Sequence, residues 1–185
     1  MSLYSFIDNQ YTDKNTTHSY LDIYENLFNK KKETAKNILE IGISTGGSIK
    51  LWHDYFTKAI IYGIEKDDTR YIKKDIFNNN RIKLLLETDA YNSSVPQSLN
   101  TKFDIIIDDG PHTLESQIDF IKLYSDFLED DGILIIEDIA EISYLNTLKD
   151  VTPEHLKQYI KTIDMRDIKG RFDDILFIID KSNKN

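Results

Sequence analysis

Short apolar runs alternate along this chain with longer segments in which apolar residues recur every three or four positions. Runs of this length and continuous hydrophobicity are typical of parallel strands that are buried on both faces. They occupy residues 37–43, 59–65, 82–86, 103–108 and 133–137. The intervening segments are long enough for crossover helices, and residues 113–129 have the periodicity of a helix packed on a sheet. The pattern predicts an α/β fold with a doubly wound, Rossmann-like sheet.

The last part of the chain predicts a change of strand direction. Residues 160–165 and 174–179 are strand-like and flank the turn signal Lys169-Gly170, so we expect an antiparallel hairpin. The prediction is a mostly parallel seven-stranded sheet with an antiparallel C-terminal strand. Residues 1–185 are expected to form a single domain. Residues 17–32 are predicted to be helical, and residues 1–35 are predicted to form a helical cap over the ligand site at the strand ends.

Composition narrows the class of protein. The 185 residues are 40% hydrophobic, which suits one α/β domain with its own core. The net charge of −9 argues against nucleic acid or an anionic membrane as partner. The chain contains no cysteine, which excludes a disulfide framework, a thiol nucleophile and a thiolate metal site. No apolar run approaches the roughly 18 residues that would span a bilayer, and the N-terminus lacks signal-peptide features, so a cytoplasmic protein is expected.

Carboxylates end two of the apolar runs. Asp108 and Asp109 follow one run, and Glu137 and Asp138 follow another. In an open parallel sheet, ligands bind outside the carboxyl ends of the strands, so these side chains are expected to meet in one crevice. Asp109, Glu137 and Asp138 together predict a divalent metal site, because clustered carboxylates need a cation or shared protons.

A histidine follows the first of these carboxylate pairs. His112 is predicted to be a general base beside the metal site. The alternative for His112 is a capping or packing role at the start of the next helix. The pair Glu137-Asp138 could likewise cap the segment that follows it.

A glycine-containing segment follows the first apolar run. Gly42, Gly46 and Gly47 allow a tight turn and a close approach of the backbone to a ligand, and Ser48 follows them. Their spacing differs from the Gly-x-Gly-x-x-Gly that binds a dinucleotide pyrophosphate. The segment therefore favours a nucleoside without phosphate and disfavours a nicotinamide dehydrogenase.

Acidic residues after the next two runs suit the rest of a nucleoside. Glu65 is placed to accept hydrogen bonds from both ribose hydroxyls. Asp89 could accept from an adenine amino group, with Ala90 and the ring of Tyr91 against the base. The alternatives are that Glu65 is a solvated strand end and that Asp89 is a turn residue.

Four motifs carry a resemblance to a known family. They are Thr12-Asp13-Lys14 with His18 and Tyr20, Glu40-Ile41-Gly42 through Gly46-Gly47-Ser48, Asp108-Asp109-Gly110-Pro111-His112, and Ile136-Glu137-Asp138. With them the chain resembles class I S-adenosylmethionine-dependent methyltransferases. More narrowly, it resembles the metal-dependent sugar O-methyltransferases grouped with macrocin and mycinamicin O-methyltransferases and cephalosporin-hydroxylase-like proteins. Position 111 is Pro where that group commonly has Ser.

The resemblance implies a role for each motif. Asp109, Glu137 and Asp138 would bind the metal, with Mg²⁺ the first choice for all-oxygen ligands. His112 would be the general base, and Asp109 would share in catalysis. The residues implied around S-adenosylmethionine are Lys14, His18, Glu40, Gly42, Gly46, Gly47, Ser48, Glu65, Asp89, Ala90, Tyr91 and Asp108.

Three functions remain open from the sequence. The first is methyl transfer from S-adenosylmethionine to a sugar hydroxyl of a glycan, nucleotide-sugar or glycosylated metabolite. The second is an O-methyltransferase for catechol-like phenols. The third is a non-catalytic S-adenosylmethionine-binding module, which the clustered carboxylates disfavour. The acceptor is thus expected to be a small molecule or a glycan hydroxyl, and a homo-oligomer stays an open alternative to a monomer.

Overall fold

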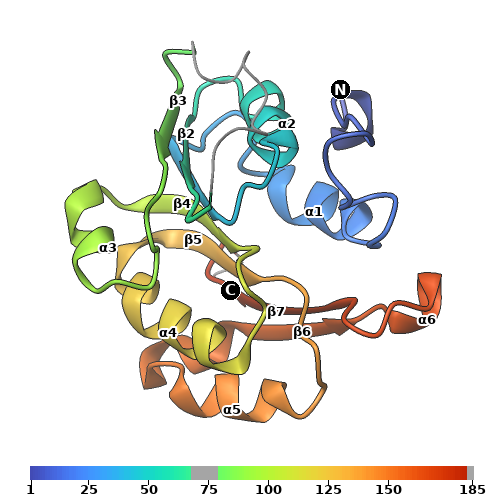
Figure 1. Ribbon diagram of the computed structural model, residues 1–185, viewed down its shortest axis with the longest axis vertical. Helices are drawn as coiled ribbons and strands as arrows, with labels where there is room; N and C mark the ends of the chain where they lie inside the picture. The colour runs from blue at the N-terminus through green and yellow to red at the C-terminus, as the bar shows by residue number, and fades with distance from the viewer. Residues whose placement is uncertain (68–78, 183–185) are drawn as a thin grey trace.

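The computed structural model describes residues 1–67 and 79–182, which form a seven-stranded sheet in the order β3-β2-β1-β4-β5-β7-β6 (Figure 1). The strands are β1 (Asn37–Ile41), β2 (Ile60–Ile64), β3 (Ile82–Leu85), β4 (Phe103–Asp108), β5 (Leu128–Ile136), β6 (Ile160–Asp164) and β7 (Ile175–Asp180). The pairings among β1 to β5 are parallel, and β7 is antiparallel to both β5 and β6. The predicted mostly parallel sheet with a reversed C-terminal strand is confirmed.

The central strands are buried on both faces because helices cover both. Alternate residues of β4 point to opposite sides, so Ile105 and Ile107 enter one core cluster and Ile106 enters the other. The first cluster includes Tyr24, Phe28 and Trp52, and the second includes a different set of helix residues: Phe120, Tyr124, Leu145 and Leu148. Two buried faces explain why these strands are continuous apolar runs in the sequence.

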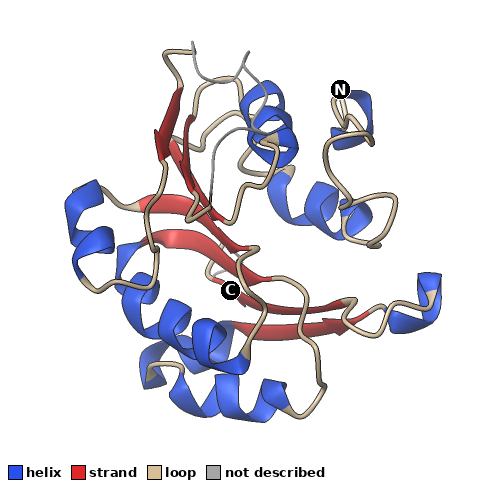
Figure 2. Ribbon diagram, in the orientation of Figure 1, coloured by secondary structure: helices blue, strands red, loops and turns tan. Residues whose placement is uncertain are grey.

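Helices lie on the two sides of the sheet, as Figure 2 shows. They are α1 (Leu21–Phe28), α2 (Gly47–Tyr55), α3 (Ser94–Leu99), α4 (Leu114–Tyr124), α5 (Tyr144–Val151) and α6 (Arg166–Lys169), with 3₁₀ turns η1 (Leu3–Ser5), η4 (Ser125–Phe127) and η5 (Glu154–Tyr159). Helices α1 and α2 cover one face, and α4 and α5 lie on the other. None of the helices in residues 1–67 and 79–182 has the length and apolar character needed to cross a membrane.

Two predicted helices are shorter in the structure. The helix predicted over residues 17–32 is α1, which begins only at Leu21, because the carbonyl of Asp13 accepts from the backbone N–H groups of Thr16, Thr17 and His18 and closes a turn there. The helix predicted over residues 113–129 ends at Tyr124, and β5 already begins at Leu128. The assignment of residues 1–35 as a cap and of the whole chain as one domain stays a prediction.

The C-terminal hairpin is confirmed, with a difference at its tip. Strands β6 and β7 pair antiparallel from Ile160↔Ile179 to Asp164↔Ile175. The predicted turn contains the short helix α6, which ends at Lys169 and is capped by Gly170 with a φ of 73°. A left-handed residue at this position is commonly glycine, because a Cβ would be strained there. The hairpin and α6 project beyond the rest of the sheet (Figure 1).

Candidate active site

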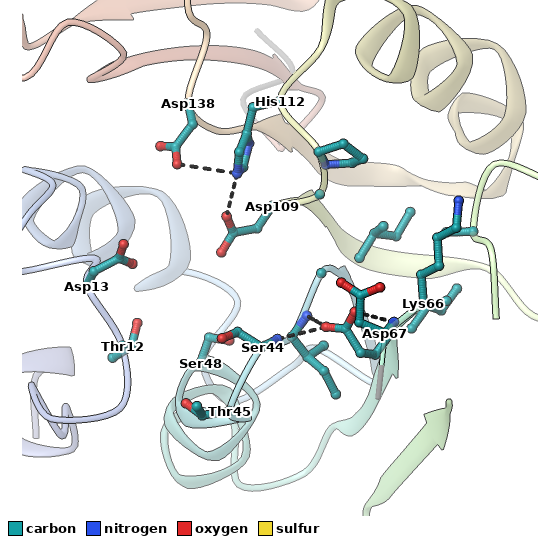
Figure 3. Close-up of a pocket in the computed structure, with 18 of the residues that line it drawn as sticks. Thr12, Asp13, Ser44, Thr45, Ser48, Lys66, Asp67, Asp109, His112 and Asp138 are labelled. Atoms are coloured by element: carbon teal, nitrogen blue, oxygen red, sulfur yellow. Dashed lines mark hydrogen bonds and ion pairs between the residues drawn. The ribbon is translucent and has the colours of Figure 1, made fainter. Parts of the chain in front are cut away.

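A cavity of about 760 Å³ lies at the carboxyl ends of the parallel strands. This is the edge at which open α/β sheets bind ligands, and the volume is in the range of small-molecule sites. The segments after β1 to β5 contribute its floor and walls, and residues 9–13 with Thr16 contribute another side. Figure 3 shows Thr12 and Asp13 on this N-terminal side, next to Thr45 and Ser48 of the segment after β1.

Glycines bring these segments close together. Gly42 has a φ of +78°, and a Cβ built on it would lie 2.0 Å from the carbonyl oxygen of Asp109, so only glycine fits. A Cβ on Gly47 would lie 2.0 Å from the carbonyl oxygen of Tyr11. That same oxygen accepts a hydrogen bond of 3.1 Å from Thr45 Oγ1. The segment after β1 therefore contacts both the segment after β4 and the N-terminal side of the cavity.

Glu65 and Asp89 both line the cavity, as the predicted nucleoside contacts require. Glu65 Oε2 accepts hydrogen bonds from the N–H groups of Ile43 (3.0 Å) and Ser44 (2.9 Å), so the carboxylate also fixes the loop after β1. Asp89 Oδ2 accepts from Lys66 Nζ at 3.0 Å, and this bond lowers the pKa of Asp89. Carboxylate oxygens have further acceptor capacity for ligand hydroxyl and amino groups.

His112 lies between two carboxylates at the cavity wall. Its Nε2 is 3.8 Å from Asp109 Oδ1 and 3.6 Å from Asp138 Oδ2, and the side chain is 35% exposed (Figure 3). His112 and Asp138 both have left-handed backbones, with φ of 58° and 53°. Such conformations cost on the order of 1–3 kcal/mol for residues other than glycine and persist mainly at functional sites. The structure therefore holds an imidazole beside two carboxylates in the cavity.

A buried lysine lies behind this wall. Lys14 is 1% exposed, and its Nζ donates to Asp109 Oδ2 at 2.7 Å and to Glu137 Oε1 and Oε2 at 2.8 and 2.7 Å. Burial alone would lower the pKa of Lys14, but Asp109, Glu137 and Glu40 outweigh it and raise that pKa well above its usual value. The hydroxyl of Tyr24 donates to Glu137 Oε1 as well.

The other carboxylates of the motifs are also hydrogen-bonded. Tyr20 donates its hydroxyl proton to Asp138 Oδ1, and His18 Nδ1 lies 3.3 Å from the same oxygen. Tyr91 donates to Asp108 Oδ1 at 2.6 Å. Burial raises the pKa of Asp108 to about 7, although the Tyr91 hydrogen bond opposes the rise.

The described residues offer two groups of ligand atoms that could hold a cation. One is Asp109, His112 and Asp138, and the other is Glu40, Asp109 and Glu137, with the atoms of each group within 4.8 Å of one another. The first group borders the cavity and offers the carboxylate oxygens that a hard divalent cation such as Mg²⁺ prefers. The predicted ligand Glu137 belongs to the second group, where Lys14 already contacts both of its oxygens. Its place on the metal stays a prediction.

The structure separates the predicted site residues into two sets. Those that line the cavity are Gly42, Ser48, Glu65, Asp89, Ala90, Tyr91, Asp109, His112 and Asp138. Those that lie behind its wall are Lys14, His18, Glu40, Gly46, Gly47, Asp108 and Glu137. The second set supports the first, since it includes the partners of Asp109 and Asp138 and the close contact of Gly47 with Tyr11.

Sequence reasoning missed several lining residues. They are Asn9, Gln10, Thr16, Lys66, Asp67 and Thr88. Lys66 and Asp67 directly follow Glu65, and Thr88 directly precedes Asp89, so these predicted neighbours were the available signal. The Thr12-Asp13 motif marked the N-terminal side, but not which of its side chains face the cavity.

Glu40 gives the metal-free protein a pH-dependent stability. Burial raises the pKa of Glu40 from 4.5 to about 7; Lys14 opposes this rise and Asp109 adds to it. The folded chain therefore keeps a proton that the unfolded chain releases, and the free energy of unfolding falls as pH rises from 4.5 to about 7. Glu40 alone should cost about 3 kcal/mol across this window. Glu40→Gln should remove that part of the slope.

Urea unfolding between pH 5 and pH 8 in the presence of a chelator would measure this pH dependence of the free energy of unfolding. Glu33→Gln, at an exposed position, is the matched control and should keep the native slope. An identical pH dependence in native protein and Glu40→Gln would contradict the assignment.

Comparisons with known proteins agree with this fold. No family model matches the chain. Among curated proteins, it is 28% identical over 131 residues to 8-demethyl-8-(2-methoxy-alpha-L-rhamnosyl)-tetracenomycin-C 3'-O-methyltransferase of Streptomyces olivaceus, covering 66% of this chain and 32% of that protein. It is 25% identical over 131 residues to demethylmacrocin O-methyltransferase of Streptomyces fradiae, with the same coverages of 66% and 32%. The chain thus spans about a third of the length of these relatives.

A solved structure shows the same fold. The MycE methyltransferase from the mycinamycin biosynthetic pathway, in complex with Mg, SAH and mycinamycin VI, superposes with a TM-score of 0.76 at 19% identity. The match covers 97% of this chain and 53% of that one. The expected resemblance is confirmed: this chain has the fold of the class I S-adenosylmethionine-dependent methyltransferases, and its relatives are the sugar O-methyltransferases of the macrocin and mycinamicin group.

Proposed function

We propose that this chain is a metal-dependent O-methyltransferase that transfers a methyl group from S-adenosylmethionine to a sugar hydroxyl. The observation that carries the proposal is the position of His112 Nε2, 3.8 Å from Asp109 and 3.6 Å from Asp138 at the wall of the cavity. A base beside two carboxylates suits the deprotonation of a weakly acidic alcohol. The names of relatives that methylate rhamnosyl-tetracenomycin and olivosyl-oleandolide support a sugar hydroxyl over other alcohols.

Each residue group has a defined task in this reaction. Glu65, Asp89 and the glycine loop after β1 would bind the nucleoside of the cofactor. Asp109 and Asp138 would hold the cation, with Glu137 as the predicted third ligand. When bound, S-adenosylmethionine would supply the methyl group, and a divalent cation would lower the pKa of the acceptor hydroxyl.

No further reactant would be needed, because a bound S-adenosylmethionine would supply the methyl group to the acceptor oxygen and its sulfur would keep the electron pair of the broken carbon–sulfur bond. The hydroxyl proton goes to His112 Nε2, which later releases it to water. Residues 9–13 and Thr16, on the N-terminal side of the cavity, would restrict the access of water to the reacting atoms.

Cofactor choice tests the first part of the proposal. Titration calorimetry should show binding of S-adenosylmethionine and S-adenosylhomocysteine but not of NAD. Glu65→Gln should lower the binding affinity for both nucleosides at least about tenfold, because it removes a charged hydrogen-bond acceptor. Glu33→Gln, an exposed change, should not. Tight binding of NAD in place of the two nucleosides would overturn the cofactor assignment.

The acceptor class needs a separate assay. Transfer of a labelled methyl group should occur to deoxysugar glycosides or nucleotide-sugars within a panel that also contains catechols. Methylation of catechols with no sugar turned over would defeat the proposed acceptor and leave the cofactor assignment intact.

A further inference from the structure

Lys14 is a charged side chain in an unusual environment. It comes from the N-terminal segment, yet its ammonium contacts Asp109 and Glu137, 95 and 123 residues away in sequence. Its side chain is 1% exposed, and Glu40 Oε1 lies 3.4 Å from the same nitrogen. One buried cation therefore faces three carboxylates, two of them almost wholly buried.

The ammonium occupies a position suited to a metal ion. Oxygen atoms of Glu40, Asp109 and Glu137 lie within 4.8 Å of one another, which makes this group one of the two candidate cation sites of the described residues. Lys14 Nζ lies at 2.7 Å from both Asp109 Oδ2 and Glu137 Oε2, inside that group. Three carboxylates without a cation would repel one another strongly in a buried site.

Asp109 belongs to both candidate sites and divides its oxygens between them. Oδ2 accepts from Lys14 at 2.7 Å, whereas Oδ1 faces His112 Nε2 at 3.8 Å. The contact with Lys14 thus fixes the orientation of the carboxylate and leaves Oδ1 directed toward the cavity side. A shared carboxylate between two cation positions is also a common arrangement for two-metal sites.

We propose that Lys14 is a permanent internal cation that fills the Glu40–Asp109–Glu137 position, so that the acidic cluster accepts one exchangeable divalent ion beside His112 instead of two. Lys14 is then a positioning residue: it orients Asp109 and does not touch the substrate. The exchangeable ion in this inference is the one that the proposed function places on Asp109 and Asp138.

Manganese binding to Lys14→Met tests the inference. Methionine keeps the length of the side chain and removes its charge. Calorimetry and electron paramagnetic resonance with Mn²⁺ alone should count one bound ion per native chain and two per Lys14→Met chain. Mn²⁺ should also raise the melting temperature of Lys14→Met more than that of the native protein. A merely structural role for Lys14 would not change the number of ions.

Two further variants make the result specific. Lys149→Met, at an exposed position of α5, should bind one ion. Lys14→Met combined with Glu40→Gln should return to one ion, because Glu40 belongs to the second position alone and that position then loses a charged ligand. Lys14→Met should also be produced both with and without Mn²⁺. If loss of the lysine charge impairs folding, the added ion should replace that charge and restore the folded protein.

The outcomes separate this inference from the proposed function. A native chain that binds no Mn²⁺ would refute the metal in the proposed function, and a gain of one ion in Lys14→Met would still support the role of Lys14. An unchanged ion count in Lys14→Met, or a variant that Mn²⁺ cannot restore, would overturn the inference whatever the native activity.

Discussion

Replacing His112 with alanine should lower methyl transfer by about a hundred- to ten-thousand-fold, which is the usual effect of losing a general base. S-adenosylmethionine affinity should change little, because the predicted nucleoside contacts Glu65 and Asp89 belong to other strand ends. The large loss of turnover is expected because His112 Nε2 lies within 4 Å of both Asp109 Oδ1 and Asp138 Oδ2 at the cavity wall, where the base is needed. Single-turnover rates with saturating cofactor would measure the effect on the chemical step.

His155 supplies the matched control. It is exposed and lies in η5, so His155→Ala should retain native turnover. Sugar methylation that continues at the native rate in His112→Ala would contradict the general-base role.

The strands were predictable because burial on both faces leaves a strong signal. Runs such as Phe103–Asp108 are mostly apolar, and the carboxylate at the end of the run marks the end of the strand. Helices gave weaker signals. Helix α3 contains Pro96 and is only six residues long, and α5 is only eight residues long, so neither was located in advance. The late start of α1 depends on a backbone turn at Asp13, which periodicity does not reveal.

The candidate site was predictable where it is local in sequence. Asp109 and His112 are three residues apart, and the topology rule for parallel sheets brought Asp138 beside them. What the sequence did not reveal is the use of each carboxylate. Asp138 borders the cavity while the adjacent Glu137 points to Lys14, and adjacent residues at a strand end face opposite sides.

The tyrosines illustrate the same limit. Tyr20 and Tyr24 are helix-spaced aromatic residues that reach Asp138 and Glu137 over separations of 118 and 113 residues. The N-terminal motif included Tyr20, but the sequence did not reveal the partner of either hydroxyl group. Contacts of this kind depend on how α1 packs against the sheet, which a pattern of single residues does not encode.

Asp138→Asn should abolish metal-dependent turnover or raise the required metal concentration by on the order of a hundredfold, because a neutral amide is a much weaker ligand than a carboxylate. The fold should tolerate this change. Asparagine adopts a φ near the observed 53° as readily as aspartate does, and its side-chain oxygen can still accept from Tyr20.

Asp138 borders the cavity beside His112, so the substitution should impair turnover of the acceptor and leave S-adenosylmethionine affinity largely intact. Activity titrated with Mg²⁺ after treatment with a chelator would measure the shift, and Asp150→Asn, at an exposed position of α5, should keep the native requirement. Full activity of the native protein in excess chelator would remove the metal from the mechanism, and His112 would then have to deprotonate the acceptor without it.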